Sequence, residues 1–590
     1  MTGQPQLIHP ARHFIVLGLL AMVIFFLLWR AVDLQVMNNG FLQEQGDARH
    51  LRVLDMPAHR GMITDRNGEP LAISTPVDSV CANPQEVIMA RDSWPLLARM
   101  LDISPDYLQR RLMDNAAREF VYIKRHINPE IAQQVMALNI PGIFLQREYR
   151  RYYPAGEVTT HIVGFTNIDD AGQEGLELAY DKWLRGTPGS KRVIKDRLGR
   201  VIENVESIEE PAPGMDLKLS IDRRIQYLAY RELKAAILQH NARSGSAVML
   251  DVRTGEVVAM VNQPSFNPNN RGTLHSDHYR NRAVTDVFEP GSTIKPFTVA
   301  AALETGKFHP HTFIDTSPGF FRVGKNTVRD IRNFGSIDVT AIIQKSSNVG
   351  ASKIALSLEP KQMWGMFSRV GFGALTGSGF PGEVGGLLSD YWRWHDIERA
   401  TLSFGYGLSV TPLQLAHAYT VLADKGRMKP VSFLMVNEVP RGESVIDAKI
   451  AQQVVAMMEK VITTEGTGVM ARIAGYHVAG KTGTVQKSGI GGYSNEHYIA
   501  MFAGIAPASR PRLAMVVVIN EPRNEEYYGG HVAAPVFATV MAGALRLMGI
   551  APDDVPAHQT AGKNKMVQYT PVSDSSVSDQ SDLRIAASGL

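Results

Sequence analysis

An uninterrupted apolar run near the N-terminus constrains the fold of this chain more than any other feature. The run extends from Phe14 to Trp29 (FIVLGLLAMVIFFLLW), and Arg12 and Arg30 flank it. With residues 31 and 32 it is long enough to cross about 30 Å of hydrocarbon, because the flanking arginines can snorkel to the interface. No small-x-small cleavage site follows it. We therefore predict a retained transmembrane signal anchor over residues 14–32, with a cleaved signal peptide and a buried core helix as the alternatives.

The orientation of this anchor rests mainly on its position. Residues 1–13 are too few to form a domain, so we predict a short cytoplasmic tail with the bulk of the chain outside. The positive charge beside the anchor is nearly symmetric and adds little to that prediction.

Length and composition exclude several classes of protein. A chain of 590 residues exceeds what one hydrophobic core can hold, so two or three domains are expected. The 61 Lys and Arg residues nearly balance the 58 Asp and Glu residues, which argues against nucleic acid as a partner. Cys81 is the only cysteine, so an intramolecular disulfide, a cysteine-based zinc site and an iron–sulfur cluster are excluded. The 17 histidines form no metal-binding motif, and we predict no metal and no cofactor.

The first half of the chain predicts an α+β module without an obvious pocket motif. Residues 36–51 read as helix, and Met56 to Ala72 alternates apolar residues around an Asn67-Gly68 turn, which is a strong hairpin signal. Helical patterns occupy residues 85–145, and Gly- and charge-rich turns are expected from there to Gly214. We assign residues 33–230 to this module.

The second half predicts strands, then a mostly helical middle, then strands. We expect a strand over Met215 to Asp222 followed by a helix, a strand pair over 246–262, and three strands between 477 and 520 before a closing helix. That order implies an α+β domain in which the first and last strands share one antiparallel sheet. We assign it residues 231–570 and expect a disordered Ser- and Asp-rich tail over 571–590.

Three short motifs occur in order in this second domain. They are Ser292-Thr293-Ile294-Lys295, Ser346-Ser347-Asn348 and Lys481-Thr482-Gly483-Thr484. S-x-x-K alone is a weak signal, but the ordered set S-x-x-K, S-x-N and K-T-G is that of penicillin-binding proteins and class A β-lactamases.

The residue types in these motifs suit acyl transfer through a serine ester. Pro296 fits only near the start of a helix, where Ser292 and Lys295 share one face, so the amine can accept the proton of the nucleophilic hydroxyl. Lys295 must then be neutral part of the time. Burial and the nearby cation Lys481 would both lower its pKa.

The other motif residues have supporting roles in this interpretation. Ser346 can relay a proton to the leaving amine, and Asn348 can hold Lys295 and the substrate backbone, although an SSN sequence is also a common helix cap or turn. Lys481 would end a strand, and Gly483 would let the substrate peptide approach that backbone as an added strand. Lys481 and Thr484 would then bind the terminal carboxylate of the substrate, and Thr482 is also assigned to substrate binding.

The backbone N–H groups of Ser292 and Thr484 are the candidates for an oxyanion hole, worth about 3 kcal/mol per donor.

The chain resembles the class B penicillin-binding proteins, and within them the division-specific FtsI type, penicillin-binding protein 3. Besides the three motifs, the resemblance rests on RGMITDRNGEPLA, RRYYPAGEVTTHIVGFTN, GQEGLE, FGYGLSVTPLQLA and EGTG, which begin at residues 60, 150, 172, 404 and 465. It covers nearly the whole chain.

The resemblance implies a D,D-transpeptidase domain of β-lactamase-like fold, held above the bacterial inner membrane in the periplasm on an elongated pedestal. It implies D-Ala-D-Ala donor and amine acceptor stem peptides as substrates, covalent acylation by β-lactams, and work at the septum beside a lipid-II polymerase and other divisome proteins. Arg60, Asp65 and Arg66 would form ion pairs that tie the pedestal to the catalytic domain. Val485 stands where relatives more often have Ala, so a specialised second copy of the division enzyme is possible.

Two other classes of protein share parts of this pattern. A β-lactamase or D,D-carboxypeptidase would carry the same three motifs. A β-lactamase also needs an acidic loop that positions a deacylating water, and no equivalent loop can be placed in this sequence. A silent sensor or structural divisome protein would carry one degenerate motif, whereas all three are intact. No glycosyltransferase motif precedes residue 240, so polymerase activity is not expected.

Overall fold

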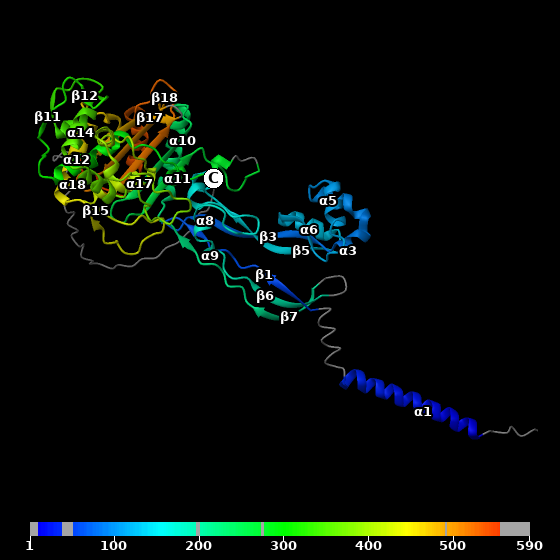
Figure 1. Cartoon of the computed structure of the whole chain (residues 1–590). Coiled ribbons are helices and arrows are strands. Elements are labelled where there is room, and N and C mark those ends of the chain that lie inside the picture. Colours follow the sequence, from blue (N-terminus) through cyan, green and yellow to red (C-terminus); the bar gives the residue numbers. More distant parts are fainter. Residues whose placement is uncertain (1–9, 38–50, 196–200, 273–275, 490–491, 555–590) are drawn as a thin grey trace, which may run out of the picture.

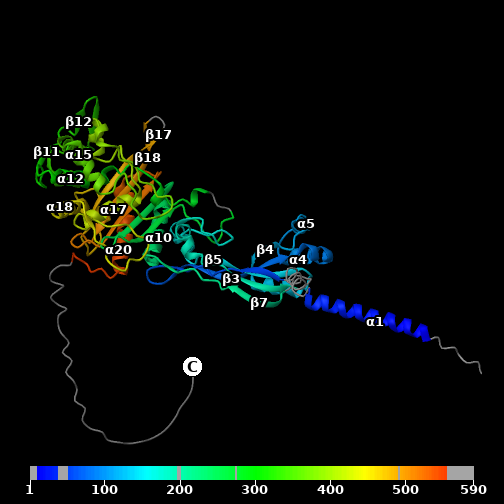
Figure 2. The same cartoon turned by 60° about the horizontal axis from the view of Figure 1, so that its bottom comes forward.

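The computed structural model describes residues 10–37, 51–195, 201–272, 276–489 and 492–554 (Figure 1). Most of the helix predicted over 36–51, most of the cytoplasmic tail, and all of the C-terminal tail at 571–590 lie outside these ranges. Three bodies follow along the chain in both views: an isolated helix, an elongated pedestal and a larger α+β domain (Figure 2).

The apolar run forms one helix, as predicted. Helix α1 (Pro10–Val32) continues into a short π-helical turn, η1 (Asp33–Met37). The 22 residues Phe14–Gln35 are apolar enough to cross a membrane, and none of this span is buried against the rest of the protein. The alternative interpretation of this segment as a buried core helix is therefore wrong. The length of the helix matches the predicted anchor.

The pedestal contains two sheets. Strand β1 (Leu51–Met56) pairs antiparallel with β6 (Gly189–Lys195), which pairs with β7 (Val201–Glu209). The prediction of turns up to Gly214 is therefore wrong at β6 and β7. These strands carry charged residues at many positions, so they lack the apolar alternation that marks a half-buried strand.

The second pedestal sheet has the order β4-β3-β2-β8, with β5 also pairing with β3. Its strands are β2 (Ile63–Thr64), β3 (Pro70–Ala82), β4 (Val121–Ile127), β5 (Ile143–Tyr152) and β8 (Leu217–Lys218). Strands β2 and β3 form the predicted hairpin, with Gly68 at φ +89°. The strand predicted from Met215 to Asp222 shrinks to the two residues of β8.

A helical lobe covers one end of this second sheet and has its own core. Its helices are α3 (Pro84–Val87), α4 (Trp94–Met100), α5 (Pro105–Met113) and α6 (Pro129–Ala137). They bury Leu97, Leu108 and Val135 against strands β3 and β4.

Ion pairs join the segments of the pedestal and also reach the second domain. Arg60 is fully buried, and its guanidinium lies 2.7 Å from Glu177 and 2.9 Å from Asp181, so it holds pedestal segments together. Asp65 accepts a hydrogen bond from the Arg223 backbone N–H at 3.0 Å, and Arg66 pairs with Glu256 at 2.9 Å. The predicted ion pair between domains is therefore right for Arg66 and wrong for Arg60, and Asp65 joins the domains through a backbone hydrogen bond instead of an ion pair.

The second domain is built on one antiparallel sheet of order β10-β9-β19-β18-β17. Its strands are β9 (Ser244–Asp251), β10 (Val257–Gln263), β17 (Ala479–Gly489), β18 (Gly492–Ala506) and β19 (Leu513–Asn520). The first strand β9 pairs with the last strand β19, as the order of predicted elements required. Strand β17, which carries the K-T-G motif, is an edge strand.

Helices cover both faces of this sheet (Figure 2). Helices α10 (Arg223–Gln239) and α20 (Ala534–Leu547) pack against each other and on the sheet, and α17 (Pro412–Ala423) contacts β9 and β19. Helix α17 is buried along its whole length, which explains its continuous apolar sequence. Helix α10 spans residue 230 and packs on β9 and β10, so all of it belongs to the body of this second domain.

Candidate active site

Ser292 lies where a short 3-10 turn (Gly291–Ile294) leads into helix α12 (Lys295–Glu304). Pro296 stands in the first turn of that helix, as predicted. Gly291 has φ +51°, and a Cβ there would lie 2.4 Å from Val485 Cγ1. The turn that presents Ser292 is therefore packed directly against strand β17.

The Lys295 side chain is fully buried and reaches the second motif. Its Nζ lies 2.6 Å from the Ser346 carbonyl oxygen, 3.1 Å from Ser346 Oγ and 2.7 Å from Asn348 Oδ1. From the edge strand, Lys481 Nζ lies 2.9 Å from the same Ser346 Oγ. The Ser346 hydroxyl therefore bridges two buried amines.

Burial perturbs the proton affinity of both amines. Desolvation lowers the pKa of Lys295 well below its ordinary value, the positive charge of Lys481 lowers it further, and the carboxylate of Asp330 raises it in part. Desolvation also lowers the pKa of Lys481 to about 7. These are the two causes expected from the sequence, and they favour a neutral amine that can act as a base.

The loop of the second motif is held in a defined conformation. Ser346 ends helix α13 (Val339–Lys345) with a left-handed backbone at φ +61°, and Ser347 caps helix α14 (Asn348–Ser357). The SSN sequence is therefore a helix cap and a part of the site at once, because the capping residue is Ser347 while its two neighbours face Lys295.

The side chain of Asp330 holds this loop in place through hydrogen bonds. Its carboxylate accepts hydrogen bonds from Ser347 Oγ at 2.6 Å and from the backbone N–H groups of Asn348 at 2.5 Å and Val349 at 3.0 Å. Asp330 lies in no motif, and nothing in the sequence signalled it.

Strand β17 supplies the other wall of the site. Thr482 and Thr484 both line the cavity, and Thr484 Oγ1 accepts a hydrogen bond from the Gly529 N–H at 2.9 Å. A Cβ at Gly483 would lie 2.5 Å from Met501 Cγ, so close packing against strand β18 requires glycine there. This packing requirement for glycine is separate from the one predicted from the sequence, which was close approach of the substrate peptide.

The free edge of β17 presents backbone donors toward the site. The Gln486 N–H points to the Tyr406 hydroxyl at 3.4 Å, away from β18. Backbone groups of alternate residues in a strand point the same way, so the Thr484 N–H also faces the free edge. This is the orientation that an oxyanion hole shared with Ser292 requires.

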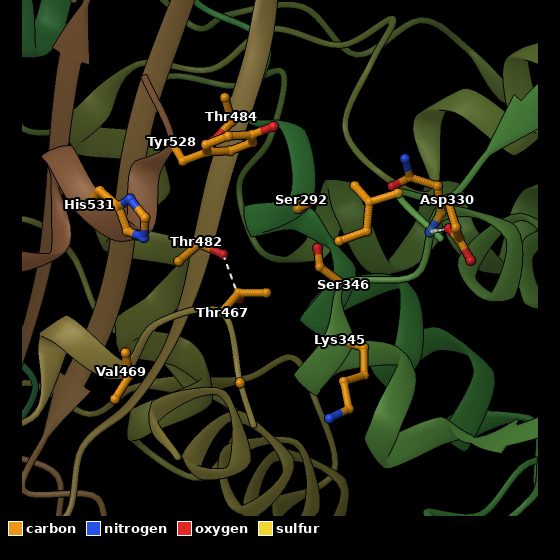
Figure 3. Close-up of a pocket in the computed structure, with 14 residues that line it drawn as sticks. Ser292, Asp330, Lys345, Ser346, Thr467, Val469, Thr482, Thr484, Tyr528 and His531 are labelled. Atoms are coloured by element: carbon orange, nitrogen blue, oxygen red, sulfur yellow. Dashed lines mark hydrogen bonds between the residues drawn. The ribbon is translucent and has the colours of Figure 1, made fainter. Parts of the chain in front are cut away.

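These elements enclose a cavity of about 380 Å³ (Figure 3). Of the predicted residues, it is lined by Ser292, Ser346, Asn348, Thr482 and Thr484, while Lys295 and Lys481 lie buried beneath it.

Sequence reasoning missed several other residues of the lining, which are Asp330, Ile331, Lys345, Thr467, Val469, Tyr528 and His531. Thr467 and its neighbour Gly466, which also lines the cavity, did carry a signal, because they lie in the EGTG segment. Within the described ranges, no three His, Cys, Asp or Glu side chains come together as a metal site.

The chain matches two family models. Residues 245–542 match the "Penicillin binding protein transpeptidase domain", and residues 55–219 match the "Penicillin-binding Protein dimerisation domain". The chain is also 47% identical to "Peptidoglycan D,D-transpeptidase FtsI" of Escherichia coli (strain K12) over 94% of each chain. It belongs to the class B penicillin-binding proteins.

Solved structures agree with this membership. The "Apo structure of TP domain from Burkholderia pseudomallei penicillin-binding protein 3" is 41% identical and covers 57% of this class B penicillin-binding protein and 98% of its own chain, with a TM-score of 0.53. A peptidoglycan synthetase of Bifidobacterium adolescentis, 24% identical, covers 86% of this chain and 98% of its own with a TM-score of 0.68, and it shows the fold alone. The family resemblance and fold class expected from the motifs are confirmed.

Proposed function

We propose that this class B penicillin-binding protein is a peptidoglycan D,D-transpeptidase that cross-links stem peptides through an acyl-enzyme on Ser292. The observation that carries the proposal is the Ser346 hydroxyl, which lies 3.1 Å from Lys295 Nζ and 2.9 Å from Lys481 Nζ at the floor of the cavity that Ser292 lines. A nucleophile, a buried amine and a hydroxyl relay are the parts that serine acyl transfer needs.

Acylation begins when neutral Lys295 takes the proton of Ser292 and the serine oxygen attacks the carbonyl of the penultimate D-alanine. The N–H groups of Ser292 and Thr484 stabilise the oxyanion. Ser346 gives its proton to the amine of the terminal D-alanine, which leaves as the C–N bond breaks, and Lys295 passes the Ser292 proton on to Ser346. An acceptor amine attacks the resulting ester and releases Ser292.

The remaining motif residues bind the donor peptide in this proposal. Asn348 orients Lys295 and the peptide backbone. Lys481 and Thr484 bind the terminal carboxylate, Thr482 also binds the substrate, and the backbone at Gly483 admits the peptide as a strand added to the free edge of β17.

The setting of the enzyme is also proposed. Helix α1 anchors it as a single-pass protein of the bacterial inner membrane, with the pedestal (33 to about 222) and the transpeptidase domain (from helix α10 to about 570) in the periplasm. We propose that it works in septal cell-wall synthesis beside a lipid-II polymerase and other divisome proteins. β-Lactams, which mimic D-Ala-D-Ala, acylate the same serine.

Labelling with a fluorescent penicillin tests the proposal. The wild-type protein and Ser444→Ala, which alters an exposed serine on β16 (Glu443–Ser444), should label stably on a denaturing gel, and Ser292→Ala should not. Label on Ser292→Ala would overturn the assignment of the nucleophile. Rapid loss of label from the wild type would indicate a β-lactamase-type hydrolase instead.

A further inference from the structure

The cavity extends past the residues that carry the acylation chemistry. Lys345, Thr467, Val469 and His531 line the part that extends beyond Ser346 and Thr482 (Figure 3). A volume of about 380 Å³ lies in the range that holds ligands much larger than one alanine. The roles proposed above leave these four residues unused.

Lys345 is a fixed cation with a weak partner. It is the last residue of α13, directly precedes Ser346, and lines the same cavity as the relay hydroxyl. Its Nζ lies 3.1 Å from a carboxylate oxygen of Glu465 and 3.1 Å from the Glu465 carbonyl oxygen. The Glu465 side chain is 74% exposed, and such a surface ion pair exchanges readily for another carboxylate.

The EGTG turn, which Lys345 contacts at Glu465, forms the adjoining wall and is tightly held. Thr467 Oγ1 lies 2.7 Å from Thr482 Oγ1 on strand β17. A Cβ at Gly530 would lie 2.4 Å from the Thr467 carbonyl oxygen, so the turn also packs against the segment after β19. Lys345 therefore faces a wall whose position relative to the K-T-G strand is fixed.

The reaction itself assigns an occupant to this end. In acylation the terminal D-alanine departs as an amine that receives its proton from Ser346. Aminolysis of the ester is the same step run backwards with a different amine, so microscopic reversibility places the acceptor nitrogen where the leaving nitrogen stood. The rest of the acceptor must then extend from Ser346 into the free part of the cavity.

We propose that this end of the cavity is the acceptor subsite, and that it takes an amine carried on an acidic peptide, a carboxylate of which pairs with Lys345 in place of Glu465. The proposal rests on the transpeptidase function proposed above. In the step it serves, the acceptor nitrogen forms a bond to the acyl carbon, the bond from that carbon to Ser292 Oγ breaks, and a proton of the amine passes through Ser346 to Ser292.

A matched pair of acceptors tests the charge recognition. D-Glutamate and D-glutamine have the same shape and the same reacting amine, and they differ by one side-chain carboxylate. The full-length protein in detergent is given an acyl-D-alanyl thioester donor with either acceptor, and the aminolysis and hydrolysis products are separated and counted. Penicillin labelling of the same samples measures the fraction of acylation-competent protein.

The wild type should use D-glutamate about tenfold better than D-glutamine, the gain of one charge-assisted hydrogen bond. Lys345→Met should bring that ratio close to one, Lys345→Arg should retain it, and Lys361→Met, at an exposed lysine on α15 (Pro360–Arg369), should match the wild type.

An unchanged ratio in Lys345→Met would overturn the proposal, as would an equal loss with both acceptors, which is the result of a merely structural role. A wild-type protein that labels with penicillin but shows no preference overturns the acceptor subsite alone. Absence of labelling in the wild type overturns the transpeptidase function as well.

Discussion

Replacing Asp330 separates the geometric and electrostatic contributions of one carboxylate to acylation. Asp330 holds the SSN loop through three hydrogen bonds, to Ser347, Asn348 and Val349. Bonds to a charged group contribute about 1.5 to 3 kcal/mol each and are not additive, so we take about 3 kcal/mol for the set. If Asp330→Ala loosens the loop by that amount, the rate constant for penicillin acylation should fall about 100-fold.

Asp330→Asn should behave differently, because its amide oxygen can still accept the two backbone N–H bonds while the charge is lost. The carboxylate of Asp330 raises the pKa of Lys295 against the larger lowering by burial and by Lys481. Removing the charge therefore lowers that pKa further. Since only neutral Lys295 accepts the serine proton, the acidic limb of the acylation profile should move to lower pH.

The assay is the second-order rate constant of acylation by a fluorescent penicillin, measured from about pH 5 to about pH 9 for the wild type and both variants. The reasoning is refuted if the acidic limb of Asp330→Asn moves to higher pH, or if the two variants are equally slow with unshifted profiles. Circular dichroism of each variant provides the control for folding.

Three further changes have definite expected outcomes. Arg60→Met leaves Glu177 buried with one fewer cation, so the free energy of unfolding of the soluble part should fall by about 3 to 5 kcal/mol in chemical denaturation; a loss below about 1 kcal/mol would contradict the buried network. Gly291→Ala should abolish penicillin labelling, because its Cβ would lie 2.4 Å from Val485 Cγ1, and adding Val485→Ala should restore part of it; equal inactivity of single and double variants would show that backbone strain alone is decisive. Deleting residues 1–37 should move the protein from the membrane fraction to the soluble fraction with penicillin labelling intact, as measured by fractionation and gel; persistent membrane association would place an anchor elsewhere.

The chemical roles of the three motifs could be predicted from the sequence, because the residues within each motif are close in sequence and therefore close in space. Ser292 and Lys295 share a turn, and the K-T-G motif occupies a strand, so each motif could be interpreted alone. The position of Ser346 Oγ between Lys295 and Lys481 could not be predicted, because it depends on a left-handed residue at the end of one helix and on the packing of three distant segments.

The elements that were missed have a common cause. Strands β6 and β7 carry charges where a half-buried strand shows alternating apolar residues, so periodicity gave no signal. Two of the three hydrogen bonds of Asp330 come from backbone N–H groups that any residue at positions 348 and 349 would provide, and such contacts leave no trace in residue types. The segment after Met215 has a strand-like pattern, but β8 pairs with β2 over two residues only and Leu219 then pairs with Leu434, because the segment crosses from one domain to the other.

The position of β17 at the edge of its sheet allows a substrate peptide to bind there, but it also exposes the protein to aggregation. An unpaired strand edge is a template for any extended chain, and in most soluble proteins it invites association between molecules. Here the free edge faces a cavity that the SSN loop and the EGTG turn also line, and the Tyr406 hydroxyl occupies the edge at Gln486. A single narrow peptide can reach that edge, whereas the edge strand of another folded molecule is kept away. The same walls that shape the catalytic site therefore protect the protein from aggregating through it.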